Sequence, residues 1–169
     1  MLESIEEIKG EESWVRKANQ PNLYFYFVDW SRHYLRSEGK SGLILYRKFL
    51  KNQDAQYVRE FLKDDLIAIV TYPRGFFDEF RTTTCIALTE KDSDRDTAKF
   101  IRISDKKLLE EPDKIRKLVY NDEIGFGGYE ITEIEKSNLQ SEENWSKYLV
   151  DVKKSRKYLE NSPITVRLD

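Results

Sequence analysis

LIAIVTYPRGFFDEFRTTTCIALTEK, residues 66–91, is the stretch that decides the fold. It begins with a β-branched apolar run, breaks at Pro73-Arg74-Gly75, carries three phenylalanines, and ends in a second apolar run after a triple threonine. Short apolar runs that are bounded by turn residues are typical of buried strands. The sequence therefore predicts two strands, residues 66–71 and 83–89, around an aromatic, hydroxyl-rich loop.

The segment before this stretch adds a strand and a helix. Residues 43–46 form a continuous apolar run, which predicts a buried strand. Asn52 or Asp54 then caps a helix over residues 54–64, whose inward face is Tyr57, Val58, Phe61 and Leu62. A strand–helix–strand order predicts that the strands 43–46 and 66–71 share one sheet through a right-handed crossover.

Residues 22–36, NLYFYFVDWSRHYLR, predict a helix with an aromatic face. Apolar residues recur at helical spacing along it, and we expect this face to point inward: Leu23, Phe27, Trp30 and Tyr34, widened by Tyr24, Val28 and Leu35. The helix carries enough aromatic residues to be covered on more than one side. Gly39 and Gly42 suit the turn that ends it.

The second half of the chain predicts smaller elements. Residues 98–103 alternate as a half-exposed strand, residues 112–119 form a short helix with Ile115, Leu118 and Val119 inward, and residues 129–134 form another strand. Residues 145–158 are typical of a helix with Trp145, Tyr148, Leu149 and Val152 on one face. We expect three parts: a polar arm over residues 1–21, an α/β domain over residues 22–104, and an α+β extension over residues 105–169.

The composition is that of an ordinary globular chain with a highly charged surface. Of its 169 residues 36% are charged, 39% are hydrophobic and the formal net charge is −2, so no global basic field attracts nucleic acid. Any contact with DNA must use a local patch or a partner. The single cysteine excludes an internal disulfide, and no apolar run is long enough for a membrane span. We expect a cytoplasmic protein without membrane contact.

Two isolated residues carry little chemistry in this sequence. His33 lies between Arg32 and Arg36 without a second histidine, which favours a solvated helix face over a metal site or catalysis. Cys85 lies in a strand pattern and is interpreted as a small buried hydrophobe. Gly125, Gly127 and Gly128 do not fall between a buried strand and a helix, so they predict no phosphate-binding loop.

The aromatic loop is the most informative candidate site. Phe76, Phe77 and Phe80 stand in a polar loop between Arg74 and Arg81. They either pack under the sheet or form a stacking wall for a flat ligand such as an extruded base. The basic stretch that contains Arg47 and Lys48 is either solvated or in contact with phosphate. Four residues are candidates for contact with DNA phosphates: Arg47, Lys48, Arg74 and Arg81.

The order of these elements resembles the second half of the catalytic domain of adenine-N6 DNA methyltransferases of restriction–modification systems. The resemblance covers about two-thirds of the chain and rests on order and spacing rather than on a single diagnostic motif. The similar segments are LYFYFVDWSRHYLR (residues 23–36), GKSGLILYRKFL (39–50), Arg59-Glu60-Phe61-Leu62, TYPRGFFDEFRTTTCIALTEK (71–91), AKFIRIS (98–104), GYEITEIEKSNLQ (128–140) and SPITVRLD (162–169).

The resemblance implies a partial Rossmann-like methyltransferase sheet, with a β-α-β unit plus an antiparallel strand and a C-terminal α+β extension. In this family a phenylalanine before the Thr-rich strand stacks on the flipped adenine, and the matching residue is Phe77, with Phe76 and Phe80 as neighbours. The family's Gly-rich S-adenosylmethionine loop and its Asn/Asp-Pro-Pro-aromatic catalytic loop precede this region, and neither occurs in residues 1–22. The strand that ends at Tyr46 also lacks the family's proline.

These departures lead to three hypotheses. The first is a fragment or split subunit of an S-adenosylmethionine-dependent methyltransferase that contributes the target-base side, with no catalytic, cofactor-binding or metal-binding residue of its own. We expect it to bind no cofactor and to be inactive alone, and to require a protein that supplies the missing half, or self-association, with DNA in the assembled complex. The second is a non-enzymatic interaction module derived from such a half. The third is a different small α/β domain whose likeness is only topological.

Overall fold

The computed structural model describes residues 22–73, 83–121 and 127–149. The polar arm, the tip of the aromatic loop and the last 20 residues lie outside these ranges. The predictions that concern Phe76, Phe77, Phe80, Val152 and the segment SPITVRLD therefore fall on residues that the structure does not describe. Among the described residues, none of the helices has the length and the apolar character that crossing a membrane requires.

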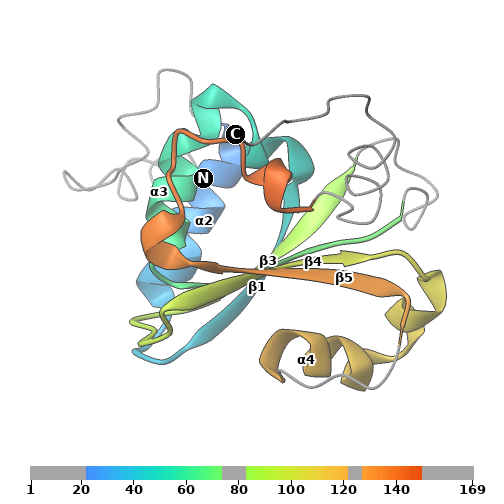
Figure 1. Cartoon of the computed structure of the whole chain (residues 1–169). Coiled ribbons are helices and arrows are strands. Elements are labelled where there is room, and N and C mark those ends of the chain that lie inside the picture. Colours follow the sequence, from blue (N-terminus) through green and yellow to red (C-terminus); the bar gives the residue numbers. More distant parts are fainter. Residues whose placement is uncertain (1–21, 74–82, 122–126, 150–169) are drawn as a thin grey trace, which may run out of the picture.

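One five-stranded mixed sheet organises the chain, in the order β1-β3-β2-β4-β5 (Figure 1). Strand β3 runs antiparallel to both β1 and β2, β2 pairs in parallel with β4, and β4 pairs antiparallel with β5. The prediction that the first two strands share a sheet is confirmed, and β3 is inserted between them. The strands are β1 Lys40–Tyr46, β2 Leu66–Thr71, β3 Thr84–Glu90, β4 Thr97–Ile103 and β5 Tyr129–Glu135.

Helices cover both faces of the sheet, and each face has its own apolar core (Figure 1). Helices α2 (Leu23–Tyr34) and α3 (Gln56–Lys63) pack on one face, and α4 (Pro112–Tyr120) packs on the other. The predicted inward residues of α3 and α4 are confirmed, since Val58, Leu62, Leu118 and Val119 are buried and Tyr57, Phe61 and Ile115 pack against them. Proline at the first position of α4 pre-sets its helical φ.

The prediction of the inward face of α2 is confirmed at Val28, which is buried, and at Tyr24, which packs against the core, but it is wrong at Leu23, Phe27 and Tyr34. Phe25 and Val28 are the buried residues of this helix, whereas Leu23, Phe27 and Tyr34 are exposed. Both sides of the helix are apolar, so the spacing alone favours neither side. A helix that is apolar all round is normally covered all round, and the described part of the chain covers only one side of α2.

The prediction that residues 98–103 form a half-exposed strand is also wrong. Strand β4 lies between β2 and β5, and all of its residues are buried except Thr97 and Arg102, which are partly exposed. The polar positions of the alternating pattern are two cations, Lys99 and Arg102, and the structure provides partners for both. Lys99 extends its stem through the core and donates from Nζ to the carbonyl of Asn121 at 3.0 Å. Arg102 forms an ion pair with Glu130 on β5.

The structure also revises several element boundaries. Strand β1 begins at Lys40 rather than at residue 43, and the helix predicted from residue 54 begins at Gln56 after a 3₁₀ turn. Residues 145–149 form a 3₁₀ helix. Its apolar residues nevertheless face inward as predicted, because Trp145 is fully buried with its ring edge-on to Phe100 at 6.0 Å between centroids.

Candidate functional site

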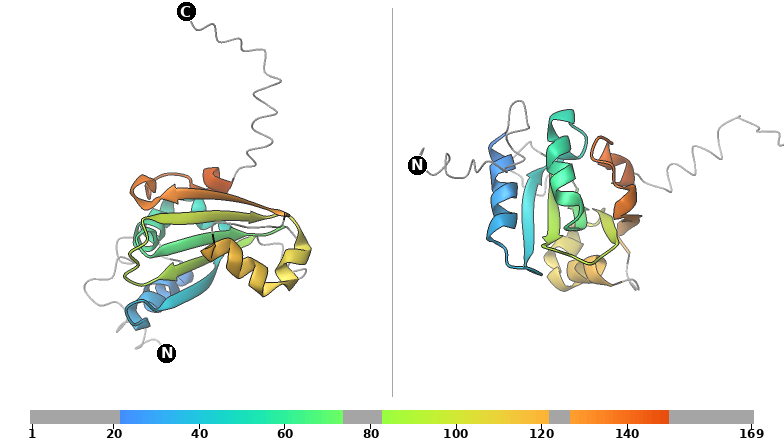
Figure 2. Two further views of the ribbon diagram at one scale, coloured as in Figure 1. Left: turned by 60° about the horizontal axis from the view of Figure 1, so that its bottom comes forward. Right: turned by 90° about the vertical axis from the view of Figure 1, so that its left-hand side faces the viewer.

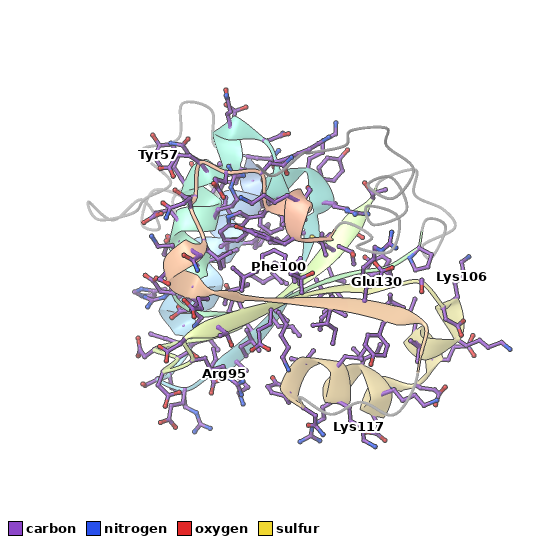
Figure 3. The ribbon with its side chains drawn as sticks, viewed as in Figure 1. Tyr57, Arg95, Phe100, Lys106, Lys117 and Glu130 are labelled. Carbon is purple, nitrogen blue, oxygen red and sulfur yellow. The ribbon has the colours of Figure 1, made fainter. Side chains whose placement is uncertain are left out.

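The ends of five strands meet at one edge of the sheet, which we call the carboxyl edge. Strands β1, β2 and β4 run in the same direction and end there, while β3 and β5 begin there. Figure 3 shows Glu130 and Lys106 at this edge and Arg95 at the opposite one. Ligands of open α/β sheets bind beyond the carboxyl ends of the strands, so this edge is the candidate site.

The carboxyl edge holds both ends of the aromatic loop. The hydroxyl groups of Tyr72, after β2, and Thr84, at the start of β3, share a hydrogen bond. Burial raises the pKa of Tyr72, and the bond to Thr84 partly offsets this. Thr71 adds a bond from Oγ1 to the carbonyl of Ile101 at 3.3 Å. The loop that contains the predicted stacking residues therefore starts and ends on rigid strands.

Arg47 and Lys48 lie beside the returning end of this loop. The backbone N–H of Arg47 donates to the carbonyl of Thr83 at 3.0 Å. The Arg47 side chain is partly exposed and Lys48 is exposed, with its Nζ 5.5 Å from the centre of the Tyr46 ring. Within the described ranges, neither cation forms an ion pair with a carboxylate. Two of the four predicted phosphate contacts thus reach the carboxyl edge, while Arg74 and Arg81 lie outside the described residues.

An ion pair at the same edge was not predicted. Arg102 donates from Nε and Nη2 to the two carboxylate oxygens of Glu130, each at 2.8 Å. This bidentate geometry fixes β4 against β5 and neutralises the charge of Arg102. The alternating patterns AKFIRI and YEITEI contain both residues, but only the register of the two strands brings them together.

The burial of Arg59 was also not predicted. Arg59 was noted only as part of the motif Arg59-Glu60-Phe61-Leu62. Arg59 is 1% exposed, and its guanidinium donates to the carbonyls of Ser141 and Phe49, each at 2.5 Å, and of Asn52 at 2.9 Å. Burial lowers the pKa of Arg59. Arg59 therefore holds together three segments behind the carboxyl edge.

The interpretations of Cys85 and His33 agree with the structure. Cys85 is fully buried, and burial raises the pKa of its thiol to about 12, so the group stays protonated and unreactive. His33 is exposed on α2 and touches the edge of the Tyr34 ring. Within the described residues, no three His, Cys, Asp or Glu side chains gather as a metal site would require.

A second surface, which we call the open margin, flanks strand β1. It comprises five of the six large exposed hydrophobic side chains in the described ranges, all on α2 or β1: Leu23 (63% exposed), Phe27 (54%), Tyr34 (77%), Ile44 (62%) and Tyr46 (39%). Helix α2 stands at the outer margin of the molecule, beside β1 (Figure 2, right). Among the described strands, only β3 pairs with β1.

No family model and no curated protein matches this chain. Solved structures do match it in fold. The type IIG restriction endonuclease BpuSI superposes with a TM-score of 0.72 at 14% identity, over 95% of this chain and 20% of that one. The type I restriction–modification methyltransferase subunit from Streptococcus thermophilus gives 0.62 at 14% identity, over 83% and 34%. A modification subunit of a putative type I restriction enzyme from Vibrio vulnificus YJ016 gives 0.53 at 12% identity, over 69% and 28%.

These matches concern the fold and a limited part of larger proteins. The chain spans between a fifth and about a third of the length of the three structures. The sheet order, the helices on both faces and the three superpositions together show that this chain shares the fold of a segment of a type I methyltransferase subunit, a type I modification subunit and a type IIG restriction endonuclease.

Proposed function

We propose that this chain is part of an S-adenosylmethionine-dependent adenine-N6 DNA methyltransferase and contributes the target-base side of its active site. The observation that carries the proposal is the bond from the Arg47 N–H to the Thr83 carbonyl, which sets a basic segment against the aromatic loop. The fold is shared with a methyltransferase subunit. DNA phosphates need cations and an extruded base needs a flat apolar wall. The carboxyl edge holds Arg47 and Lys48 beside an end of the loop in which we predict that wall.

In this proposal Phe77 stacks on the flipped adenine, with Phe76 and Phe80 beside it. Arg47, Lys48, Arg74 and Arg81 contact the phosphates that flank the extruded nucleotide. Base stacking on an aromatic ring contributes about 1–3 kcal/mol. That energy helps to hold a base that has lost its own stacking partners in the duplex.

Within the described ranges, the residues do not form a loop that fits S-adenosylmethionine. A cofactor loop of this class needs glycines between a buried strand and a helix, but β1 is followed by Arg47-Lys48-Phe49-Leu50 and β4 by Ser104-Asp105. The carboxylate of Glu130 at the carboxyl edge is already bound by Arg102. We therefore propose that these residues contribute no cofactor-binding group. Micromolar binding of S-adenosylmethionine to this chain alone, measured by calorimetric titration, would overturn that proposal.

The proposal is tested by reconstitution. The chain is coexpressed with the product of the reading frame directly upstream of its own, which we expect to encode the Gly-rich and Asn-Pro-Pro-aromatic loops. Transfer of a tritiated methyl group to DNA is measured for the complex and for each component. We expect N6-methyladenine only with the complex, and a stable complex that methylates no DNA would contradict the proposal.

A second candidate function is a non-enzymatic interaction module derived from a methyltransferase half. The open margin favours it, because exposed apolar side chains of this size mark contact surfaces whether or not chemistry follows. The two candidates differ at the aromatic loop. An interaction module would keep its partner and any partner activity unchanged after Phe77→Ala.

A further inference from the structure

The edge of the sheet opposite to the carboxyl edge, which we call the amino edge, holds a pocket that the proposed function does not use. Strands β2 and β4 begin at this edge and β5 ends there, and Figure 3 shows Arg95 on this side, away from Glu130. The pocket has a volume of about 530 Å³, which is typical of sites for small molecules. Its lining includes Asp64, Ser93, Arg95, Asp96, Glu135 and Lys136.

Lys136 is held in this pocket by two hydrogen bonds. Its Nζ donates to the carbonyl of Asp64 at 2.6 Å, and its backbone N–H donates to the carbonyl of Asp96 at 2.7 Å. The residue is partly exposed, so a reagent in the pocket reaches it. A neutral amine donates to a carbonyl as an ammonium does and keeps a lone pair. The bond to Asp64 therefore orients Nζ without using the electrons that make an amine nucleophilic.

The surroundings of Lys136 favour its neutral form. Burial lowers the pKa of Lys136 from its ordinary value of 10.5, and the charge of Arg95 acts in the same direction. The carboxylates of Asp65, Asp64 and Asp96 oppose this shift and do not cancel it. The charged groups that face Lys136 or line its pocket are Asp64, Asp65, Arg95, Asp96 and Glu135.

Two other lysines of this chain have the opposite environment. A hydrogen bond to Glu60 raises the pKa of Lys63, and a hydrogen bond to Glu143 raises the pKa of Lys147. Both side chains are partly open to solvent, at 27% and 47% exposure. They serve as internal references, since they differ from Lys136 in their protonation and remain accessible.

Arg95 supplies a cation for an anionic reagent in the same pocket. Its Nε lies 3.7 Å from a carboxylate oxygen of Glu90, and its guanidinium carbon lies 5.5 Å from the centre of the Tyr120 ring. The side chain is 40% exposed. A guanidinium has five N–H donors in a fork that suits phosphate, which is more than one long ion pair uses.

We propose that Lys136 is a site of acylation by acyl phosphates, whose phosphate group binds to Arg95. The lone pair of Nζ attacks the acyl carbon and forms a nitrogen–carbon bond. The bond from that carbon to the phosphate oxygen breaks, and its electron pair leaves with the phosphate, which also takes the proton lost from Nζ. The product is a neutral amide, so the burial that disfavours an ammonium does not oppose it. This inference is independent of the proposed function, because Arg47 and Lys48 lie at the carboxyl edge.

The first test compares lysines within the full chain. The chain is incubated with acetyl phosphate at pH 8, and the initial rate of acetylation at each lysine is measured by peptide mass spectrometry. We expect Lys136 to react at least about threefold faster than Lys63 and Lys147. In urea the three rates should become equal. A rate at Lys136 no higher than at the other two, or a preference that persists in urea, would overturn the proposal.

The second test asks whether Arg95 binds the phosphate group. Arg95→Gln also removes a charge that lowers the pKa of Lys136, so it slows every acylating reagent. The rate with acetyl phosphate is therefore divided by the rate with an uncharged reagent, the N-hydroxysuccinimide ester of acetic acid. We expect Arg95→Gln to lower this ratio at Lys136 about fivefold. Arg116→Gln, an exposed position of α4 outside the pocket lining, should leave the ratio unchanged.

Urea midpoints confirm that both variants are folded, and inorganic phosphate provides a test on the wild-type chain. Added phosphate should slow acetylation of Lys136 by acetyl phosphate and leave its reaction with the uncharged ester unchanged. An unchanged ratio in Arg95→Gln, or no competition by phosphate, would overturn the binding of the phosphate group by Arg95.

Discussion

The backbone N–H of Arg47 donates to the carbonyl of Thr83 at 3.0 Å, and this bond joins the end of β1 to the end of the aromatic loop. The two residues are 36 positions apart in the sequence. The bond fixes the start of a basic segment at the carboxyl edge, where the predicted stacking loop leaves the sheet. The account of DNA contact depends on this proximity.

Removal of the two cations at this edge is expected to weaken DNA binding without changing sequence preference. Arg47→Ala and Lys48→Ala should each lower the slope of log affinity against log salt by about 1, since each lost phosphate contact releases about one counterion fewer. The slope is measured by filter binding of the reconstituted complex at salt concentrations from about 50 to about 200 mM. Lys117→Ala, an exposed cation on α4, removes the same charge and should leave the slope unchanged.

Loss of the buried guanidinium is expected to destabilise the fold. Arg59→Met fills a similar volume but leaves the carbonyls of Phe49, Asn52 and Ser141 without their donor. The free energy of unfolding should fall by about 3 kcal/mol, as expected for buried polar groups that lose their partners. Arg59→Lys should recover less than half of this, because one ammonium cannot reproduce the planar fork. Urea denaturation curves report the loss, and an unchanged midpoint for Arg59→Met would contradict the structural role.

The thiol of Cys85 is expected to resist alkylation in the folded protein. Its pKa is raised to about 12, against an ordinary value of 9.0, so at pH 8 the folded state holds on the order of 1,000-fold less thiolate than the unfolded state. Because the folded pKa is raised, this group's contribution to stability is complete below pH 9 and is lost as the pH rises toward 12. Iodoacetamide labelling at pH 8, with and without urea, compares the two states. Equal labelling rates with and without urea would mean that the thiol is exposed to solvent in the folded protein, which would contradict the prediction.

The outer side of α2 is expected to drive association of the isolated chain. Sedimentation velocity of the wild type should show oligomers or precipitation, and Phe27→Glu should shift the chain toward monomer because it removes an exposed apolar ring. His33→Glu introduces the same side chain at an exposed polar position of the same helix and should have little effect. A stable, monodisperse wild-type monomer would count against an open margin that needs a partner.

Local patterns predicted most of the sheet, and tertiary context decided the rest. The apolar runs 43–46, 66–71 and 83–89 became β1, β2 and β3 because β-branched residues between turn signals have few other stable placements. The buried position of residues 98–103 could not be predicted, because the ion pair of Arg102 and the bond from Lys99 to Asn121 depend on distant segments.

The prediction of the inward side of α2 failed in part, for a different reason. Its sequence is apolar on both sides, and in this chain the sheet selects Phe25 and Val28 over the longer stripe that contains Phe27 and Tyr34. Helical spacing identifies the apolar stripes of a helix, but it does not show which of two stripes is buried. The position of Arg47 and Lys48 relative to the loop likewise required the register of β1 and β3, which no periodicity encodes.

The role of Phe77 tests the central claim most directly. The measurement is the rate of methyl transfer to adenine N6 by the reconstituted complex with wild-type chain, Phe77→Ala and Phe77→Tyr, at equal occupancy of the partner. The account predicts that Phe77→Ala lowers the rate by about 5- to 150-fold, which corresponds to the 1–3 kcal/mol of base stacking, while Phe77→Tyr keeps the ring and most of the rate. Equal rates for all three chains would contradict it.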